Sequence, residues 1–255
     1  MSERTSFKPG TFSWADLATN DLEGAKAFYG ALFGWEFEDM PAGEGMVYSM
    51  ASKDGLHVAA AAQDTRFPPH WNNYVTVADA DEAAKKATEA GGTVAMEPFD
   101  VLQAGRMAVV QDPTGALLCV WQAKDHHGAR LVNAPGAMTW NDLTTPDVKA
   151  AARFYADWLG WRVEEIPQSN GYHVIWNGER TNGGMVELRP DEGPIPPSWM
   201  PYFGVLDSLD DAMERTTELG GRIVFGPQSV PPGRFTVAAD PTGAVFALWE
   251  GDYDD

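Results

Sequence analysis

Residues 13–21 read SWADLATND and residues 139–147 read TWNDLTTPD, and this repeated stretch decides the fold. Each copy is followed by a similar aromatic segment, FYGALFGW at 28–35 and FYADWLGW at 154–161. Trp14 and Trp140 are 140 − 14 = 126 residues apart, and the D-P-T-G segments that begin at Asp112 and Asp240 are 240 − 112 = 128 apart. A nearly constant offset over this length indicates a tandem duplication with one small insertion.

The composition excludes several classes of partner. The chain of 255 residues carries 18 Lys and Arg against 37 Asp and Glu, a formal net charge of −19. This charge repels phosphate backbones and anionic lipids, so we expect neither nucleic acid nor a membrane surface as a partner. The start of the chain has no apolar signal region, and no stretch approaches the roughly 18 apolar residues of a membrane span. With Cys119 as its single cysteine, the chain is expected to be cytoplasmic.

The order of apolar runs and turn residues predicts a βαβββ unit. A strand over 11–17 precedes a helix whose apolar residues recur every three or four positions up to Gly34, and three short strands follow before Pro68-Pro69. A second unit of the same kind follows, with a helix over 81–90 and strands up to residue 122. In the second half, Thr145 is the predicted helix cap and Pro146 the first helical residue.

The repeat also predicts the domain organisation. Each half contains two βαβββ units, and the chain therefore contains four. We expect one domain over residues 8–123, a linker over 124–134 that carries His126 and His127, and a second domain over 135–252. The predicted fold class is α+β.

The repeated pattern D-x-x-x-A-x-x-F-Y-x-x-x-x-G-W, seen from Asp21 to Trp35 and from Asp147 to Trp161, resembles the vicinal oxygen chelate superfamily. This superfamily includes glyoxalase I, bleomycin-resistance proteins and extradiol dioxygenases, and the likeness is nearest to tandem glyoxalase-like proteins of actinobacteria. The resemblance implies that each pair of units curls its strands into an open cup around the site. Single-half members commonly dimerise, so the chain resembles such a dimer fused into a monomer, and a further homodimer stays open.

Catalytic members of the family hold a divalent metal from side chains on the first and last strands of the units. By resemblance, these positions carry Trp14, Ala59, Asn72 and Cys119 in the first half and Trp140, Glu187, Met200 and Ala247 in the second. A divalent site needs about three suitable ligands, and neither half supplies them. We therefore expect no metal site and no cofactor. A displaced ligand set remains an alternative, with His57 beside Asp16, or His173 beside Asp142 and Glu187.

The cup positions predict a binding site for a small organic molecule. An indole platform with a few polar groups suits a flat, partly apolar ligand, because aromatic rings give a large contact area at low entropic cost. The predicted ligand-binding residues are Trp14, Asp16, Asn72, Trp140, Asp142, His173 and Met200. The repeat pairing of the tryptophans suits a core role equally well, and for Trp14 and Trp140 both interpretations stay open.

Glu187 is the candidate catalytic residue. Its expected repeat partner is Ala59 and its neighbours Val186 and Leu188 are apolar, so a buried carboxylate here would act as a general base. The competing interpretation is a surface acid in a very acidic protein.

Three functions are compatible with these patterns. The first is a protein that binds a small, partly apolar molecule in a cup without a standard metal site. The second is an enzyme of detoxification or secondary metabolism, either a glyoxalase-like lyase or isomerase or a hydroxylase-type oxygenase. The third is an interaction protein whose cups are vestigial. Fold analogy alone favours the first.

Overall fold

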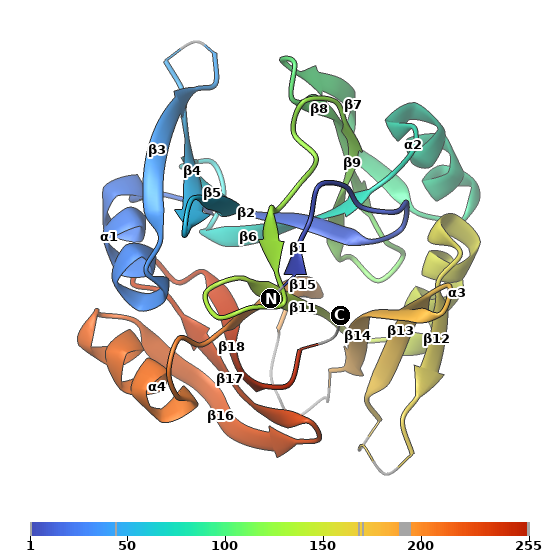
Figure 1. Cartoon of the computed structure of the whole chain (residues 1–255). Coiled ribbons are helices and arrows are strands. Elements are labelled where there is room, and N and C mark those ends of the chain that lie inside the picture. The colour runs from blue at the N-terminus through green and yellow to red at the C-terminus, as the bar shows by residue number, and fades with distance from the viewer. Residues whose placement is uncertain (1, 44, 168, 170, 189–194, 254–255) are drawn as a thin grey trace.

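The computed structural model describes residues 2–43, 45–167, 169, 171–188 and 195–253. This part of the chain contains two eight-stranded mixed sheets, a small two-stranded sheet and four helices, which confirms the α+β class and the four βαβββ units (Figure 1). No helix in these described ranges is long and apolar enough to cross a bilayer.

The first sheet has the strand order β3-β4-β5-β2-β6-β9-β8-β7. Its elements are β2 (Phe12–Thr19), α1 (Leu22–Phe33), β3 (Glu36–Pro41), β4 (Val47–Lys53), β5 (Leu56–Gln63), β6 (His70–Thr76), α2 (Ala80–Glu89), β7 (Thr93–Val101), β8 (Gly105–Gln111) and β9 (Leu117–Ala123). β2 pairs in parallel with β5 and antiparallel with β6, so the two units join along their first strands.

The second sheet repeats this order as β12-β13-β14-β11-β15-β18-β17-β16. Its elements are β11 (Met138–Thr145), α3 (Val148–Leu159), β12 (Arg162–Glu165), β13 (His173–Asn177), β14 (Arg180–Glu187), β15 (Ser198–Gly204), α4 (Leu209–Glu218), β16 (Arg222–Val230), β17 (Gly233–Ala239) and β18 (Val245–Gly251). Each cup is thus built within one half of the chain. A small sheet of β1 (Ser2–Glu3) and β10 (Leu131–Val132), not expected from the sequence, pairs the N-terminus with the segment between the halves.

The helix caps correct one sequence prediction. Asp21 caps α1 by accepting a hydrogen bond from the Gly24 backbone N–H at 3.0 Å, and Asp147 caps α3 in the same way at 2.9 Å. The predicted cap at Thr145 is wrong, because Thr145 is the last residue of β11 and the helix begins at Val148. The carboxylate of Asp147, two residues later, accepts from the free Ala150 N–H of the first turn.

The outer faces of the two sheets share one hydrophobic core, and α1 lies against α4 while α2 lies against α3 (Figure 1). The repeated F-Y and D-P-T-G motifs connect the halves. The Tyr29 hydroxyl donates to Asp240 Oδ2 at 3.1 Å, and the Tyr155 hydroxyl donates to Asp112 Oδ2 at 3.1 Å. Since each bond joins a helix of one half to a turn of the other, the motifs serve the scaffold rather than the cups.

Candidate functional site

The floor of the first cup, here cup 1, is built around the carboxylate of Asp16 on β2. Its Oδ2 atom accepts hydrogen bonds from the hydroxyls of Tyr48 at 3.0 Å and Tyr74 at 2.8 Å. Its Oδ1 atom accepts from Asn72 Nδ2 at 2.8 Å, and Trp14 Nε1 donates to the Tyr48 hydroxyl at 2.9 Å. Three strands, β2, β4 and β6, therefore place one acid, two phenols, an amide and an indole at a single point.

The floor of the second cup, cup 2, has nearly the same arrangement around Asp142 on β11. Asp142 Oδ1 accepts from Tyr172 Oη at 2.7 Å and from Trp140 Nε1 at 2.9 Å, and Oδ2 accepts from Tyr202 Oη at 2.7 Å. The main difference is Met200, which takes the place of Asn72 opposite the aspartate in the antiparallel register. The floor of cup 2 is consequently less polar.

Burial changes the acidity of both floors. Desolvation raises the pKa of Asp16 and of Asp142 above the ordinary aspartate value, and the hydrogen bonds that each carboxylate accepts offset part of this rise. Burial also raises the pKa of Tyr74 and of Tyr202 well above the usual phenol value, so these hydroxyls stay protonated and donate. With three donors already in place, each carboxylate keeps about one lone-pair direction for a ligand.

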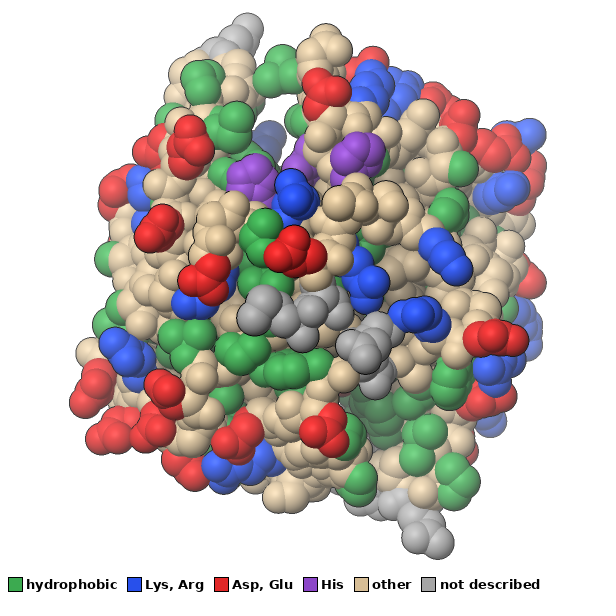
Figure 2. Space-filling model, viewed as in Figure 1, with side chains coloured by type: hydrophobic (Ala, Val, Ile, Leu, Met, Phe, Trp, Pro, Cys, Tyr) green, Lys and Arg blue, Asp and Glu red, His purple; other side chains and the backbone are tan. Residues whose placement is uncertain are grey.

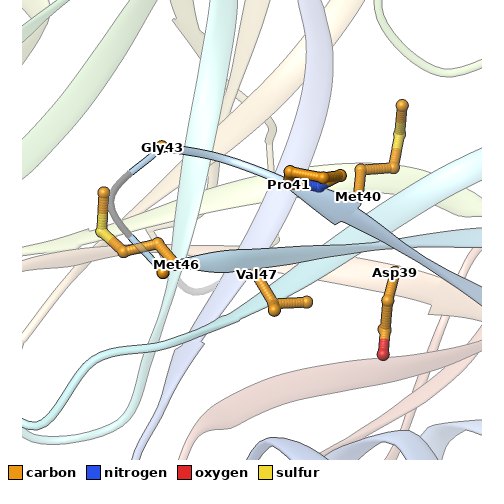
Figure 3. Close-up of a pocket in the computed structure, with 7 residues that line it drawn as sticks. Asp39, Met40, Pro41, Gly43, Met46 and Val47 are labelled. Atoms are coloured by element: carbon orange, nitrogen blue, oxygen red, sulfur yellow. The ribbon is translucent and has the colours of Figure 1, made fainter.

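Strand pairing shows which side chains form the walls of cup 1. Met40 on β3 lies opposite Tyr48, which faces the floor, and its neighbour Asp39 bonds to Lys26 of α1 on the outer side. Because successive side chains on a strand alternate, Met40 faces the cup, and Figure 3 shows Met40 and Asp39 pointing to opposite sides of the strand. A surface pocket at this end of β3 and β4 is lined by Asp39, Met40, Pro41, Gly43, Gly45, Met46 and Val47.

The opposite wall of cup 1 is also apolar. Met96 and Phe99 on β7 lie opposite Val109 and Met107, which pack into the cup, and both β7 side chains are exposed. Figure 2 shows a hollow between the β3–β4 and β7–β8 hairpins, with histidine side chains along its border. An apolar molecule entering here meets flexible methionine side chains, which adapt readily to different shapes.

Cup 2 has a more aromatic wall than cup 1. The rings of Tyr202 and Phe235 lie 5.6 Å apart between centroids, and those of Phe235 and Phe225 lie 6.1 Å apart. Tyr202 is buried at the floor, Phe235 is partly exposed, and Phe225 is exposed at the edge of the sheet. Together they form a column, here called the aromatic column, that leads from Asp142 to solvent.

The structure brings together most of the predicted ligand-binding residues. Trp14, Asp16 and Asn72 meet at the floor of cup 1, and Trp140 and Asp142 meet at the floor of cup 2 with Met200 alongside. Their role in binding a ligand stays a prediction.

His173 does not join this group. Tyr172 reaches Asp142 in the cup, and its neighbour His173 pairs with Met185 of the core and lies on the opposite face of the sheet. Its Nδ1 atom lies 2.9 Å from the Gly171 carbonyl oxygen. The suggested metal set of His173, Asp142 and Glu187 is therefore not assembled.

Glu187 lies exposed at the end of β14, paired with Thr145. Thr19 is the repeat partner of Thr145, and it pairs with Gln63. Gln63 is therefore the structural counterpart of Glu187, and the expected match to Ala59 is wrong. Gly184 is the cup-facing residue on this strand, as Ala60 is on β5, because they pair with Asp142 and Asp16. The buried environment on which a base at Glu187 depended is not found.

Sequence reasoning missed four residues of the cup floors, Tyr48, Tyr74, Tyr172 and Tyr202. A signal was present, since Tyr74 and Tyr202 share the 128-residue offset of the motifs. Tyr48 and Tyr172 are 172 − 48 = 124 apart, an offset that becomes visible only once the strands are paired.

The donor set of the cup floors does not fit a divalent metal. Each floor offers one carboxylate, already bonded to three donors, and the neighbouring positions carry Ala60 and Cys119 in cup 1 and Gly184 and Ala247 in cup 2. Burial raises the pKa of the Cys119 thiol, which disfavours the thiolate that a metal binds. In the described ranges, no three His, Cys, Asp or Glu side chains lie where they would hold one ion.

Comparison with known proteins places these features in a family. The family model described as Glyoxalase/Bleomycin resistance protein/Dioxygenase superfamily matches residues 11–120 and 132–248. A putative glyoxylase from Mycobacterium bovis is 40% identical over 257 residues, covering 97% of each chain. The anthracycline biosynthesis protein DnrV from Streptomyces peucetius is 35% identical over 266 residues, covering 96% of this chain and 95% of that protein.

Solved structures show the same fold at low sequence identity. A Mn(II)-bound glyoxalase from Novosphingobium aromaticivorans superposes with a TM-score of 0.67 at 19% identity, covering 97% of this chain and 85% of that one. A 2,3-dioxygenase from a Pseudomonas species gives a TM-score of 0.68 at 17% identity, covering 96% and 94%. The two matched segments and the repeated cups show that the chain belongs to the glyoxalase/bleomycin resistance protein/dioxygenase superfamily.

Proposed function

We propose that the chain binds a flat, partly apolar organic molecule in cup 2, with a hydroxyl or carbonyl group of that molecule at Asp142. The observation that carries this proposal is the aromatic column, which runs from a buried carboxylate to the edge of the sheet. Trp140, Tyr172 and Trp249 are only partly buried around it, so their ring faces are available for stacking.

The relatives suggest a ligand class. DnrV is named for anthracycline biosynthesis, and anthracyclines are planar polycyclic molecules with phenolic and carbonyl oxygens. Such a molecule would stack along the aromatic column while one oxygen meets the free lone pair or the proton of Asp142. The site is complete within one half, so a monomer suffices, as an internal pseudo-dimer.

Doxorubicin is a suitable probe because its own fluorescence is quenched when it stacks on aromatic side chains. We expect saturable quenching with one site per chain in cup 2 and clear weakening in Phe235→Ala. The matched control is Met107→Ala, since Met107 holds the same position in cup 1, opposite Trp121 as Phe235 is opposite Trp249. Equal affinity of both variants and the wild type would overturn the proposal.

A second candidate is an enzyme in which Asp142 moves a proton, as in a lyase or isomerase. This candidate is supported by the buried carboxyl of Asp142, because desolvation raises its pKa toward neutral pH. Turnover of the hemithioacetal of methylglyoxal and glutathione, and oxygen consumption with catechol, test the glyoxalase and oxygenase versions. Both assays are run on metal-free protein and after addition of Mn(II) or Fe(II), alongside metal analysis of untagged protein. Turnover that is lost in Asp142→Asn would favour the enzyme, whereas binding without turnover favours the binding protein.

A further inference from the structure

Cup 1 has a feature that cup 2 lacks in the described residues, a segment that crosses its open side. Residues 124–130, here called the strap, follow β9 and run from the β7–β8 turn to the beginnings of β2 and β5. At one end the His126 backbone N–H donates to the Ala104 carbonyl at 3.0 Å. At the other end the N–H groups of Ala129 and Arg130 donate to the carbonyls of Ser13 at 2.8 Å and His57 at 2.7 Å.

The strap is fixed in shape by a glycine. Gly128 has a φ of +109°, and a Cβ atom there would lie 2.6 Å from the Ser13 carbonyl oxygen and 3.0 Å from the Phe7 ring. Backbone contact this close admits no side chain, so the strap holds one path across the cup. In cup 2, the chain after β18 is described only through Tyr253, and no comparable crossing is found in this part.

His126 projects from the strap into cup 1. Its ring lies edge-on to Trp14 with centroids 4.5 Å apart, 5.9 Å from Trp121 and 6.5 Å from the ring of His57. Burial lowers its pKa to about 4, so the imidazole is neutral at pH 7. Its Nε2 atom is buried and has no hydrogen-bond partner.

An unpartnered nitrogen in this position needs an explanation. A buried polar atom without a partner costs about 1–3 kcal/mol, and protein interiors seldom keep one without a use. The ring is flanked by the aromatic side chains of Trp14 and Trp121, so a polar group of a molecule inside the cup can supply the missing partner.

We infer that cup 1 is a second ligand site, separate from cup 2, in which His126 Nε2 hydrogen-bonds an oxygen of a small aromatic alcohol or ketone. The ligand enters between the β3–β4 and β7–β8 hairpins, its ring lies beside Trp14, and the strap forms the remaining wall. The floor of cup 1 carries Cys119 and Ala60 where cup 2 has the smaller Ala247 and Gly184, and these larger side chains, together with the strap, favour a one- or two-ring molecule over a longer polycycle.

The test uses 2-naphthol as probe and histidine side-chain nitrogen resonances as readout, since the chain has only five histidines. We expect the Nε2 resonance of His126 to shift saturably with 2-naphthol. In His126→Phe, followed through the nearby His57 resonance, the affinity should fall about tenfold, the loss expected for one hydrogen bond. His126→Gln keeps a hydrogen-bonding group and should recover part of this loss, and His127→Phe on the exposed neighbour should change nothing.

A His126 resonance that does not move at saturating 2-naphthol would overturn the inference, and so would equal affinity of wild type and His126→Phe.

Gly128→Ala gives an independent check, because it displaces the strap while leaving His126 in the sequence. Its control is Gly91→Ala, at a φ of +97° with no atom within 4 Å of an added Cβ. Weakened 2-naphthol binding only in Gly128→Ala supports the strap, and equal binding in both contradicts it. Doxorubicin binding to cup 2 is measured in the same variants, so failure of one site is distinguishable from failure of the other.

Discussion

Cup 1 and cup 2 place the same set of four side chains at the floor, an aspartate, an indole and two phenols, but they differ above it. Cup 1 adds the amide of Asn72 and is crossed by the strap with His126, whereas cup 2 has Met200 and the aromatic column. Trp14 is 3% exposed, while its counterpart Trp140 is only partly buried.

This difference separates the scaffold from the recognition surface. The duplicated motifs that persist in both halves hold the core, the turns and the floor carboxylates. The residues that a ligand would touch first are those that have diverged. The two proposed ligand sites therefore share a similar floor and differ in their walls, and each prediction below probes one side of that comparison.

Removing the D-P-T-G aspartate of either half should lower the stability of the protein by the same amount. Asp112 Oδ1 accepts bonds from the backbone of Thr114, Gly115 and Ala116, and Oδ2 accepts from Tyr155. Asp112→Ala leaves these donors unpaired, so the free energy of unfolding should fall by roughly 3–5 kcal/mol. Urea unfolding followed by circular dichroism measures this loss.

Asp240→Ala should cost about the same, because Asp240 makes the equivalent bonds to its turn and to Tyr29. Asp79→Ala is the control, since Asp79 is an exposed helix cap whose loss should cost only about 1 kcal/mol. A large loss in one half alone would contradict the view that the halves share one scaffold.

The strap should make the stability of cup 1 depend on pH. The folded pKa of His126 is lowered to about 4, whereas the unfolded value is near 6.5, so the unfolded chain binds a proton that the folded chain excludes. Stability from this group is fully present above about pH 6.5 and should fall by up to about 3 kcal/mol as the pH drops toward 4.

Unfolding free energies of wild type and His126→Gln, measured between pH 7 and pH 4, isolate this contribution. His127→Gln is the matched control on the exposed neighbouring residue. Parallel curves for wild type and His126→Gln would mean that the imidazole is not buried in the cup.

The aromatic column should matter for doxorubicin in cup 2 only. Phe235→Ala removes the middle ring of the column, and we expect a loss of about 2 kcal/mol, or about thirtyfold in affinity. Met107→Ala at the same position of cup 1 should change the affinity less than twofold, within about 0.4 kcal/mol. Fluorescence titration of both variants decides the matter, and a reversed order would move the doxorubicin site to cup 1.

The repeat in the sequence was sufficient to predict the fold because its motifs fix the scaffold. Asp112 and Asp240 in their turns and Tyr29 and Tyr155 on their helices recur at a nearly constant offset, and the αβ order follows from the spacing between them. The structure places Asp16 and Asp142, which lie next to these motifs, at the cup floors, while their role in binding stays a prediction.

The walls were less predictable, since counting residues does not determine strand register. The offset is 126 at Trp14, 124 at Tyr48 and 128 at Tyr74, so the local register near Glu187 differs from that of the motifs by several residues. A slip of one residue turns a side chain to the other face of a sheet, which is how Ala59 was assigned to a cup that Ala60 faces. The strap gave no periodic signal at all, because its position depends on hydrogen bonds to Ser13 and Ala104, far away in sequence.

The smallest expected effect concerns the floor aspartates. It tests whether the two floors, which have similar structures, also titrate similarly. Desolvation raises the folded pKa of Asp142 above the unfolded value, so the folded chain binds the proton up to a higher pH than the unfolded chain does. The free energy of unfolding should therefore decrease as the pH rises from the ordinary aspartate pKa through the raised one, and stay lower above it. Asp142→Asn cannot ionise, and its curve should lack this decrease.

Asp16→Asn should remove a decrease of the same sign in cup 1, because desolvation also raises the pKa of Asp16. Both effects should be smaller than that of His126, since each carboxylate accepts three hydrogen bonds that offset part of its desolvation. The double variant should show the sum of the two, as the cups lie in separate sheets. If only one of the two variants changes the pH dependence, the floors are not equivalent, and the cup whose aspartate does titrate is the one in which proton transfer should be sought.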